Sequence, residues 1–242
     1  MAIYFLADIH LAEHRPAITA AFLDTLAAIA GDAEAVYILG DLYDYWLGDD
    51  LASPFHQRIA AALAALPCPV YYQHGNRDFL LSAAYARAAH LHLLPERYRL
   101  QLGDTPVLLE HGDLLCTDDH GYQRLRRVLR RRPLQWLYYR LPRALRRRLA
   151  EKLRQQSQAR TRRKASAITD THPAAIRTAL ENAAATVLIH GHTHRPAVHR
   201  LDNGNTVYVL GDWRPYGEIL RYADGAFTLA DCRANCGRIA VF

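Results

Sequence analysis

A chain of 242 residues, half of them hydrophobic, can bury one substantial core, and we expect a single domain over residues 1–242. No run reaches the roughly 20 apolar residues of a membrane-spanning helix, and residues 1–6 lack the features of a signal peptide, so a cytosolic protein is predicted. The net charge is +6 and the arginines crowd into residues 124–163, which indicates either an anionic partner or a solvated helical face.

Short apolar runs rich in β-branched and aromatic residues recur along the chain, and each ends in a polar, turn-forming cluster. They predict strands at residues 3–7, 35–39, 70–73, 107–110, 187–189 and 207–210. Because each run delivers polar residues at its C-terminal end, and ligand sites of open α/β sheets lie beyond those ends, a single convergent active site is predicted.

Helical patterns occupy the intervals between several of these strands. They predict helices at residues 17–30, at residues 54–66 with Ser53 as a cap, and at residues 173–185, which begin with a proline close to Thr171. Strand alternating with helix indicates an α/β fold with mostly parallel pairing in its first half. Turn signals at residues 202–204 and 224–225 predict added antiparallel strands, and hence two sheets.

The segment of residues 119–170 interrupts this alternation and is predicted to be a basic, helical insertion within the domain. Leu145, Leu149 and Leu153 fall on one helical stripe surrounded by arginines. An aromatic and aliphatic patch precedes them, between Pro133 and Pro142. An insertion that lies over the strand ends would serve as a lid; the alternative is a structural cap with a solvated basic rim.

The four cysteines do not form a paired CxxC framework. Only Cys232 and Cys236 lie close together, and their spacing is compatible with half of a zinc site for which no second pair exists. We expect reduced, structural cysteines.

Several of the polar residues that follow the predicted strands are metal-ligand types. They are Asp8, His10, Asp41, Asn76, His111, His192 and His194. Carboxylate and imidazole ligands together suit Mn²⁺, Fe²⁺ or Zn²⁺ better than Ca²⁺ or Mg²⁺. Taken singly, Gly-Asp and Gly-Asn pairs are ordinary turn formers and a buried histidine is usually a core residue. The repetition of such clusters after one strand after another favours a metal site.

These clusters resemble the five signature blocks of the calcineurin-like metallophosphoesterases. The matching blocks are Asp8-x-His10, Gly40-Asp41, Gly75-Asn76, His111-Gly112-Asp113 and Gly191-His192-Thr193-His194. The resemblance implies a two-sheet β-sandwich flanked by helices, of α/β class, with a centre of two divalent ions. It implies that one ion is held by Asp8, His10, Asp41 and His194, and the other by Asp41, Asn76, His111 and His192.

Arg77 departs from the pattern of this family, in which a histidine often follows the Gly-Asn pair and protonates the leaving group. Arginine is a poor proton donor but grips phosphate well. A phosphate monoester that leaves from a phosphoanhydride has a pKa of about 6, so it departs without being protonated. The presence of Arg77 instead of a proton donor therefore favours a pyrophosphate substrate. Asn76, Arg77 and His192 are the predicted catalytic residues.

The Gly75-Asn76-Arg77-Asp78 block, the Gly211-Asp212-Trp213 segment and the basic insertion resemble a narrower group, the UDP-2,3-diacylglucosamine diphosphatases of lipid A synthesis. The resemblance implies water attack on the α-phosphate, with release of UMP and 2,3-diacylglucosamine 1-phosphate (lipid X), and Mn²⁺ as the metal. It implies substrate contacts at Asn76, Arg77, Asp119, Ser157, Thr161, Lys164 and His192. Thr161 stands where an asparagine is common in that group. Because Asp118 adjoins Asp119, the alignment at this position is open by one residue.

A diacylated substrate must leave a bilayer at least in part, so the insertion is predicted to rest on an anionic membrane, peripherally at the cytoplasmic face of the inner membrane. No nucleic acid and no obligate protein partner is expected. Two alternatives stay open: a soluble nucleotide pyrophosphatase on the same scaffold, and a metal-free or nucleic-acid-binding module that uses the arginines.

Overall fold

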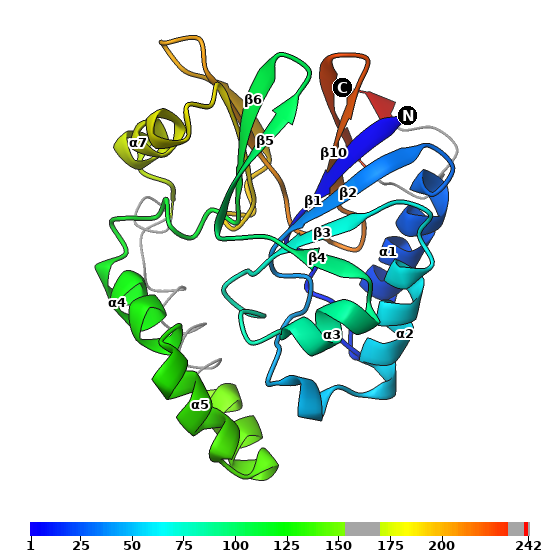
Figure 1. The fold of residues 1–242 in the computed structure, drawn as a ribbon, viewed down its shortest axis with the longest axis vertical. Helices are drawn as coiled ribbons and strands as arrows, with labels where there is room; N and C mark the ends of the chain where they lie inside the picture. Colours follow the sequence, from blue (N-terminus) through cyan, green and yellow to red (C-terminus); the bar gives the residue numbers. More distant parts are fainter. Residues whose placement is uncertain (153–169, 232–239, 242) are drawn as a thin grey trace.

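The computed structural model describes residues 1–152, 170–231 and 240–241, and in these ranges the chain forms two facing sheets with helices on their outer sides (Figure 1). The larger sheet has seven strands in the order β12-β11-β10-β1-β2-β3-β4. Its strands are β1 (Ala2–Leu6), β2 (Ala33–Leu39), β3 (Val70–Gln73), β4 (Leu91–Leu93), β10 (Glu218–Ala223), β11 (Ala226–Asp231) and β12 (Ala240–Val241). Strands β1 to β4 run parallel, and β10 joins β1 antiparallel.

The smaller sheet has five strands in the order β5-β6-β7-β9-β8. They are β5 (Arg97–Leu102), β6 (Thr105–Glu110), β7 (Val187–His190), β8 (Ala197–Arg200) and β9 (Thr206–Val209). Strands β6, β7 and β9 are parallel neighbours, and β5 and β8 close the two edges antiparallel.

Strand β1 explains why the apolar run at the N-terminus is unbroken. Tyr4 and Leu6 face the helices, whereas Phe5 between them faces the second sheet, and all three side chains are buried. A strand that is buried on both faces must be apolar at every position, because successive side chains point to opposite sides. The core therefore has three layers of contact: helix on sheet, sheet on sheet, and sheet on helix.

Three helices cover the larger sheet, and one covers the smaller. Helices α1 (Pro16–Ile29), α2 (Pro54–Ala64) and α3 (Ala83–Ala88) share a buried cluster with β1 to β4, and α7 (Pro173–Ala183) packs on β7 and β9. A short 3-10 turn, η1 (Asp49–Leu51), precedes α2. The backbone N–H of Ser53 donates to His56 Nδ1, which forms half of the capping box at the start of α2. His172 is the N-cap of α7, and its side chain accepts from the backbone N–H of Ala174.

The described part of residues 119–170 is mostly helical. Helices α4 (His120–Leu129) and α5 (Arg132–Arg140) are followed by a helix over residues 143–152, and together they extend away from the two sheets (Figure 1). The predicted aromatic patch is divided, since Tyr138 and Tyr139 bond to core loops while Trp136 and Leu137 are exposed. Leu153, Ser157, Thr161, Lys164, Cys232 and Cys236 lie outside the described residues.

The predicted strands, the three predicted helices and the two-sheet α/β architecture are confirmed. The antiparallel strands expected around the two predicted turns are the hairpins β8–β9 and β10–β11. Elements that the sequence analysis missed are α3, β4, β5 and β12, which are short or lie at sheet edges. No helix in the described part of the chain is long and apolar enough to cross a membrane.

Candidate metal centre

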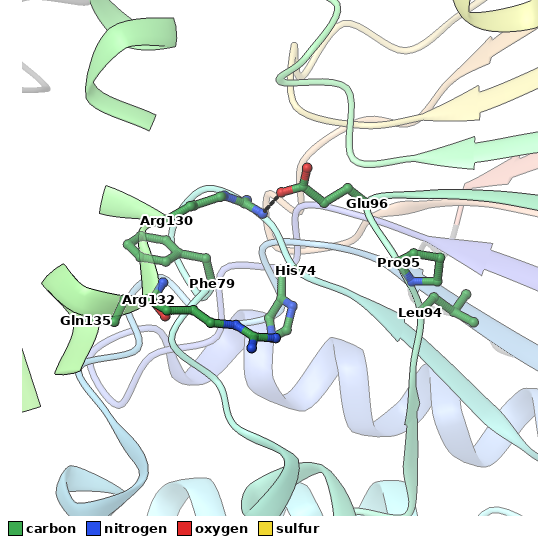
Figure 2. A pocket seen from close by; sticks show the side chains of 8 residues that line it. All are labelled: His74, Phe79, Leu94, Pro95, Glu96, Arg130, Arg132 and Gln135. Carbon is green, nitrogen blue, oxygen red and sulfur yellow. Dashed lines mark hydrogen bonds and ion pairs between the residues drawn. The ribbon is translucent and has the colours of Figure 1, made fainter. Parts of the chain in front are cut away.

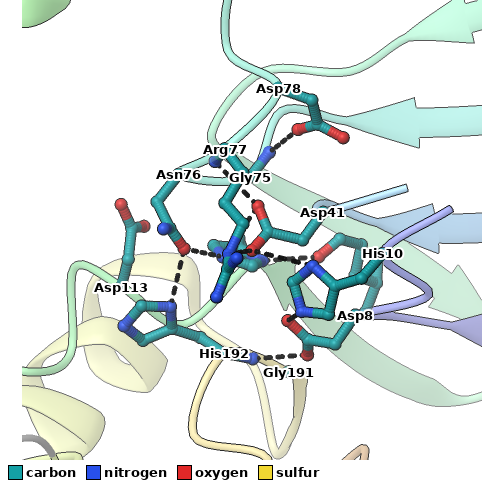
Figure 3. Close-up of polar contacts among 12 residues, drawn as sticks. Asp8, His10, Asp41, Gly75, Asn76, Arg77, Asp78, Asp113, Gly191 and His192 are labelled. Carbon is teal, nitrogen blue, oxygen red and sulfur yellow. Dashed lines mark hydrogen bonds and ion pairs between the residues drawn. The ribbon is translucent and has the colours of Figure 1, made fainter. Parts of the chain in front are cut away.

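All of the predicted metal ligands lie in loops at the C-terminal ends of strands, and both sheets contribute. Asp8, His10, Asp41 and Asn76 follow β1, β2 and β3 of the larger sheet, and His111, His192 and His194 follow β6 and β7 of the smaller one. Figure 3 shows Asp8, His10, Asp41, Asn76 and His192 around one small space. The facing of the two sheets therefore assembles the site from five separate loops.

The first half-site consists of Asp8, His10 and His194. The Nε2 atoms of the two histidines lie 3.2 Å apart, and Asp8 Oδ1 lies 3.3 Å from His194 Nε2 and 3.9 Å from His10 Nε2. Asp8 Oδ1 is buried and has no well-formed hydrogen bond among the described residues. Buried polar atoms normally have partners, and a cation would satisfy all three ligand atoms at once.

The second half-site is centred on Asn76. Its Oδ1 atom lies 3.0 Å from His111 Nε2 and 3.0 Å from His192 Nδ1. Asp41 Oδ1 lies 3.8 Å from His111 Nε2, and Asp41 Oδ2 lies 3.9 Å from His10 Nδ1. Asp41 is thus placed between the two half-sites, as a bridging ligand requires.

The pKa shifts of the proposed ligands differ in direction. Although burial lowers them, the neighbouring carboxylates of Asp8 and Asp41 raise the pKa values of His111 and His194, whereas the shifts of the other groups fit a cation at this place. Burial, with Asp78 and Asp8 nearby, raises the pKa of Asp41, so the ionised carboxylate is poorly stabilised by the protein alone. Burial lowers the pKa of His192 to about 3, and burial together with Arg77 lowers the pKa of His10. These two imidazoles are therefore neutral near pH 7 and have lone pairs for a metal, as a divalent-metal site requires.

The backbone around the ligands is strained. Positive φ angles, which are uncommon in residues with a side chain, occur at Asp8, His10, Asp41, His192 and His194. Each such residue costs about 1–3 kcal/mol, and strain of this kind clusters at functional sites. The sequence gives no direct signal of it.

Two glycines let the ligand loops pack directly against each other. A Cβ atom on Gly75 would lie 2.0 Å from Asp41 Oδ1, and one on Gly191 would lie 2.2 Å from Asp8 Oδ2. Since no side chain fits there, the Gly-Asn and Gly-His pairs of the sequence mark close approach of two loops rather than ordinary turns.

Arg77 lies beside the metal ligands and is held by carboxylates. Its NH1 atom donates to Asp44 Oδ1 at 2.8 Å, and its Nε atom lies 3.5 Å from Asp41 Oδ2. Its backbone N–H donates to Asp41 Oδ1 at 2.9 Å, so the residue also orients the bridging carboxylate. The side chain stays 29% exposed, which leaves part of the guanidinium open to a ligand.

Two of the proposed histidine ligands also contact groups for which the sequence analysis predicted no role. Asp212 Oδ2 lies 3.5 Å from His194 Nδ1, on the ring edge opposite the half-site, and His111 Nδ1 lies 2.8 Å from the carbonyl of Leu39. Contacts of this kind fix which imidazole nitrogen faces a metal. Asp212 belongs to the Gly211-Asp212-Trp213 segment of the family resemblance, which is the sequence feature that could have identified it as a supporting residue.

Of the predicted substrate residues, the structure brings Asn76, Arg77 and His192 together at the centre (Figure 3). Asp119 is the N-cap of α4, where its side chain accepts a hydrogen bond from the backbone N–H of Tyr122 at 3.0 Å. A cavity of about 370 Å³ lies beside the Asn76 loop and is lined by His74, Phe79 and the side chains of Arg130 and Arg132, among others (Figure 2).

The two-sheet fold and the paired groups of Asp and His ligands are those of a metal-dependent phosphoesterase. A family model described as calcineurin-like phosphoesterase matches residues 1–196, and the chain belongs to that family. The chain is 45% identical over 222 residues to a UDP-2,3-diacylglucosamine hydrolase of Shewanella piezotolerans, which covers 91% of this chain and 93% of the relative. It is 46% identical over 228 residues to a UDP-2,3-diacylglucosamine hydrolase of Edwardsiella ictaluri, which covers 91% and 88%.

Solved structures agree with the fold. A crystal structure of a Vps29 mutant from Entamoeba histolytica matches with a TM-score of 0.52 and 16% identity, over 96% of this chain and 91% of that chain. The phosphoesterase Yfce from E. coli matches with a TM-score of 0.50 and 16% identity, over 96% and 94%. At such identities the likeness concerns the fold alone.

Proposed function

We propose that this chain hydrolyses the pyrophosphate bond of UDP-2,3-diacylglucosamine and releases UMP and 2,3-diacylglucosamine 1-phosphate for lipid A synthesis. The names of relatives that are about 45% identical over more than nine-tenths of the chain support this substrate. The structural observation that carries the proposal is Arg77, a fixed cation beside the ligand cluster at the position of a proton donor.

Two divalent ions, Mn²⁺ in our proposal, would be held by the residues of the two half-sites. One set is Asp8, His10, Asp41 and His194, and the other is Asp41, Asn76, His111 and His192. When bound, such ions polarise a phosphoryl oxygen and lower the pKa of a coordinated water, which becomes a nucleophile near pH 7.

The side chains beside the ions bind and stabilise the phosphoryl group. Arg77 donates to the non-bridging oxygens and stabilises the negative charge of the transition state without giving up a proton. His192 turns Nδ1 toward Asn76, so its Nε2 atom is available to donate to the same phosphate. The leaving group is a sugar phosphate of pKa about 6, which departs without protonation.

The test is release of UMP from UDP-2,3-diacylglucosamine in detergent by the purified enzyme, with Mn²⁺ and after chelation. We expect rapid release with Mn²⁺ and little without it. No release of UMP with Mn²⁺ would overturn the proposal. Equal turnover of simple nucleotide pyrophosphates would favour a nucleotide pyrophosphatase instead.

We further propose that the insertion rests on an anionic membrane surface at the cytoplasmic face of the inner membrane, while its substrate is drawn from the bilayer. Trp136 is 58% exposed and Leu137 is 54% exposed, and Leu145 and Leu149 on the following helix are exposed as well. Arginines surround these side chains in the sequence. Apolar residues beside cations are typical of segments that lie on anionic lipid headgroups.

A further inference from the structure

Helix α4, the first helix of the insertion, contacts the loop that carries Asn76. Arg130 NH2 donates to the carbonyl oxygen of Gly75 at 2.8 Å, and this carbonyl belongs to the peptide unit that leads into Asn76. The N–H of Gly75 donates to Asp78 Oδ1 at 2.9 Å. The position of Asn76 is thus fixed from the core by Asp78 and from the insertion by Arg130.

The same helix also contacts the loop that carries His111. Asp113, which is buried, accepts hydrogen bonds from Arg126 Nε at 2.6 Å and from the hydroxyl of Tyr122 at 2.6 Å. Gln123 Nε2 donates to the backbone carbonyl of Asp113 at 2.7 Å. The ring of Tyr122 lies 6.0 Å from the ring of His192, centroid to centroid.

Glu96 joins the two arginine contacts into one network. Its Oε1 atom accepts from Arg126 Nη2 at 2.8 Å. The same atom is ion-paired with Arg130 Nη1, as Figure 2 shows. The side chains of Arg126 and Arg130 are only 10% and 16% exposed, so solvent screens these contacts less than it screens ordinary surface pairs.

The other half-site has no such support. Within residues 1–152, 170–231 and 240–241, no hydrogen bond or ion pair joins α4 to Asp8, His10 or His194. The half-sites also differ in charge when the shared Asp41 is counted in both. The first then has two carboxylates, Asp8 and Asp41, whereas the second has one carboxylate and the neutral Asn76.

We propose that Arg126 of α4 and Arg130, the C-cap residue of that helix, are positioning residues for the second metal half-site, so that the insertion is a structural part of one of the two metal sites. The inference rests on the proposed dinuclear centre. Its consequence is that a displacement of α4 changes the affinity for the ion of the second half-site more than that for the other ion, which shares only Asp41 with it.

The experiment is a titration of the metal-free, full-length enzyme with Mn²⁺, followed by calorimetry and by the electron paramagnetic resonance signal of free Mn²⁺. We expect two ions in the wild type, and in Arg126→Ala or Arg130→Ala about 10-fold or greater weakening of one ion, with a clearly smaller effect on the other. Arg124→Ala and Arg127→Ala are matched controls, because both remove an exposed arginine from the same helix. Both controls should bind as the wild type does.

Variants with one half-site disabled show which ion is affected. In a His10→Ala background, adding Arg130→Ala should weaken the remaining ion about 10-fold, and in an Asn76→Ala background its effect should be clearly smaller. Wild-type affinity for both ions in Arg130→Ala, or equal weakening of both, would overturn the inference. Fewer than two ions in the wild type would instead overturn the proposed centre.

Folding is checked by far-UV circular dichroism. Arg126→Ala leaves the buried Asp113 without its principal cation and is the variant at risk of misfolding. Arg130→Ala removes one ion-pair partner of Glu96, which is 46% exposed and can be solvated by water. This variant should therefore fold, and it is sufficient for the test by itself.

Discussion

At the scale of single residues, Arg77 combines two functions that mutation separates. Its backbone N–H donates to Asp41, and its side chain, which contacts Asp44 and Asp41, is the group that we propose binds the phosphate. Arg77→Ala keeps the backbone contact, so we expect both ions to stay bound while kcat on the lipid substrate falls about 100-fold, as on loss of one donor to a transition-state oxyanion. Metal content and steady-state kinetics measure the two effects.

Arg77→Lys serves as the companion variant. It keeps the charge but loses the planar fork that matches phosphate, so an intermediate kcat is expected. Loss of metal from Arg77→Ala would show that the side chain has a structural role rather than the one assigned to it.

Asp212 offers a second prediction at the same scale. Its carboxylate lies 3.5 Å from His194 Nδ1 and directs His194 Nε2 toward Asp8. We expect Asp212→Asn to weaken Mn²⁺ binding at the first half-site about 10-fold, since partners of ligating histidines typically contribute that much. Calorimetric titration with Mn²⁺ measures it.

The matched control is Asp202→Asn, an exposed position in the turn between β8 and β9. It removes the same charge far from any ligand and should leave both affinities unchanged. Asp212 also pairs with Arg214 at 2.7 Å, so Arg214→Ala distinguishes loss of that pair from loss of the histidine contact.

At the scale of elements, the far end of the insertion is attached to the core through Arg146. Its guanidinium is buried, is ion-paired in bidentate fashion with Asp50 and donates to the carbonyl of Leu47 at 3.1 Å. We expect Arg146→Ala to destabilise the attachment by about 1–3 kcal/mol and so speed amide exchange over residues 132–152. Hydrogen–deuterium exchange measures this, with β1 and β6 as internal references.

Arg143 provides the contrast, because it pairs with the same carboxylate at 3.1 Å but its side chain is 67% exposed. Exposed pairs contribute little, so exchange in Arg143→Ala should match that of the wild type. Equal effects of the two substitutions would mean that charge, rather than burial, determines the attachment.

The elements also show what a sequence can reveal. Buried strands such as β1 and β7 were predicted because burial on both faces requires an unbroken apolar run. Strand β5 was missed although Tyr98, Leu100 and Leu102 alternate with polar residues, as in a half-buried edge strand. Helix α3 has only six residues and no helical period long enough to detect.

For the candidate metal centre, residue types and their positions after strands were sufficient to predict which seven side chains the structure brings together. The positive φ angles of Asp8 and Asp41, and the contacts of Asp212 and Arg130, were not predicted. They depend on which loops meet after folding, and residues far apart in the sequence carry no local pattern that reports such a meeting.

At the scale of the whole molecule, the centre lies where the two sheets face each other, so its geometry depends on their packing. Phe5 and Leu39 from the larger sheet share a buried cluster with Leu109 and Ile189 from the smaller one. These residues immediately precede the ligand loops of β1, β2, β6 and β7. A rigid sandwich thus holds the ligands, while the insertion presents a separate, partly apolar surface.

That surface leads to a prediction about membranes. Trp136→Ser combined with Leu137→Ser removes two exposed apolar side chains from α5 without changing the charge. If they enter the lipid interface, a loss of about 1.4 kcal/mol corresponds to about 10-fold weaker binding. Co-sedimentation with phosphatidylglycerol vesicles measures it, and binding to phosphatidylcholine vesicles should be weak for every variant.

Val198→Ser is the matched control. Val198 is 48% exposed and stands near the basic Arg200, but it lies on β8 at the edge of the smaller sheet and not on the insertion. Vesicle binding should be unchanged in this variant. If the α5 double variant binds vesicles like the wild type yet loses turnover of the lipid substrate, the apolar surface contacts the acyl chains rather than the bilayer. If both binding and turnover are unchanged, the exposed side chains form only a structural cap, and the proposed membrane surface is wrong.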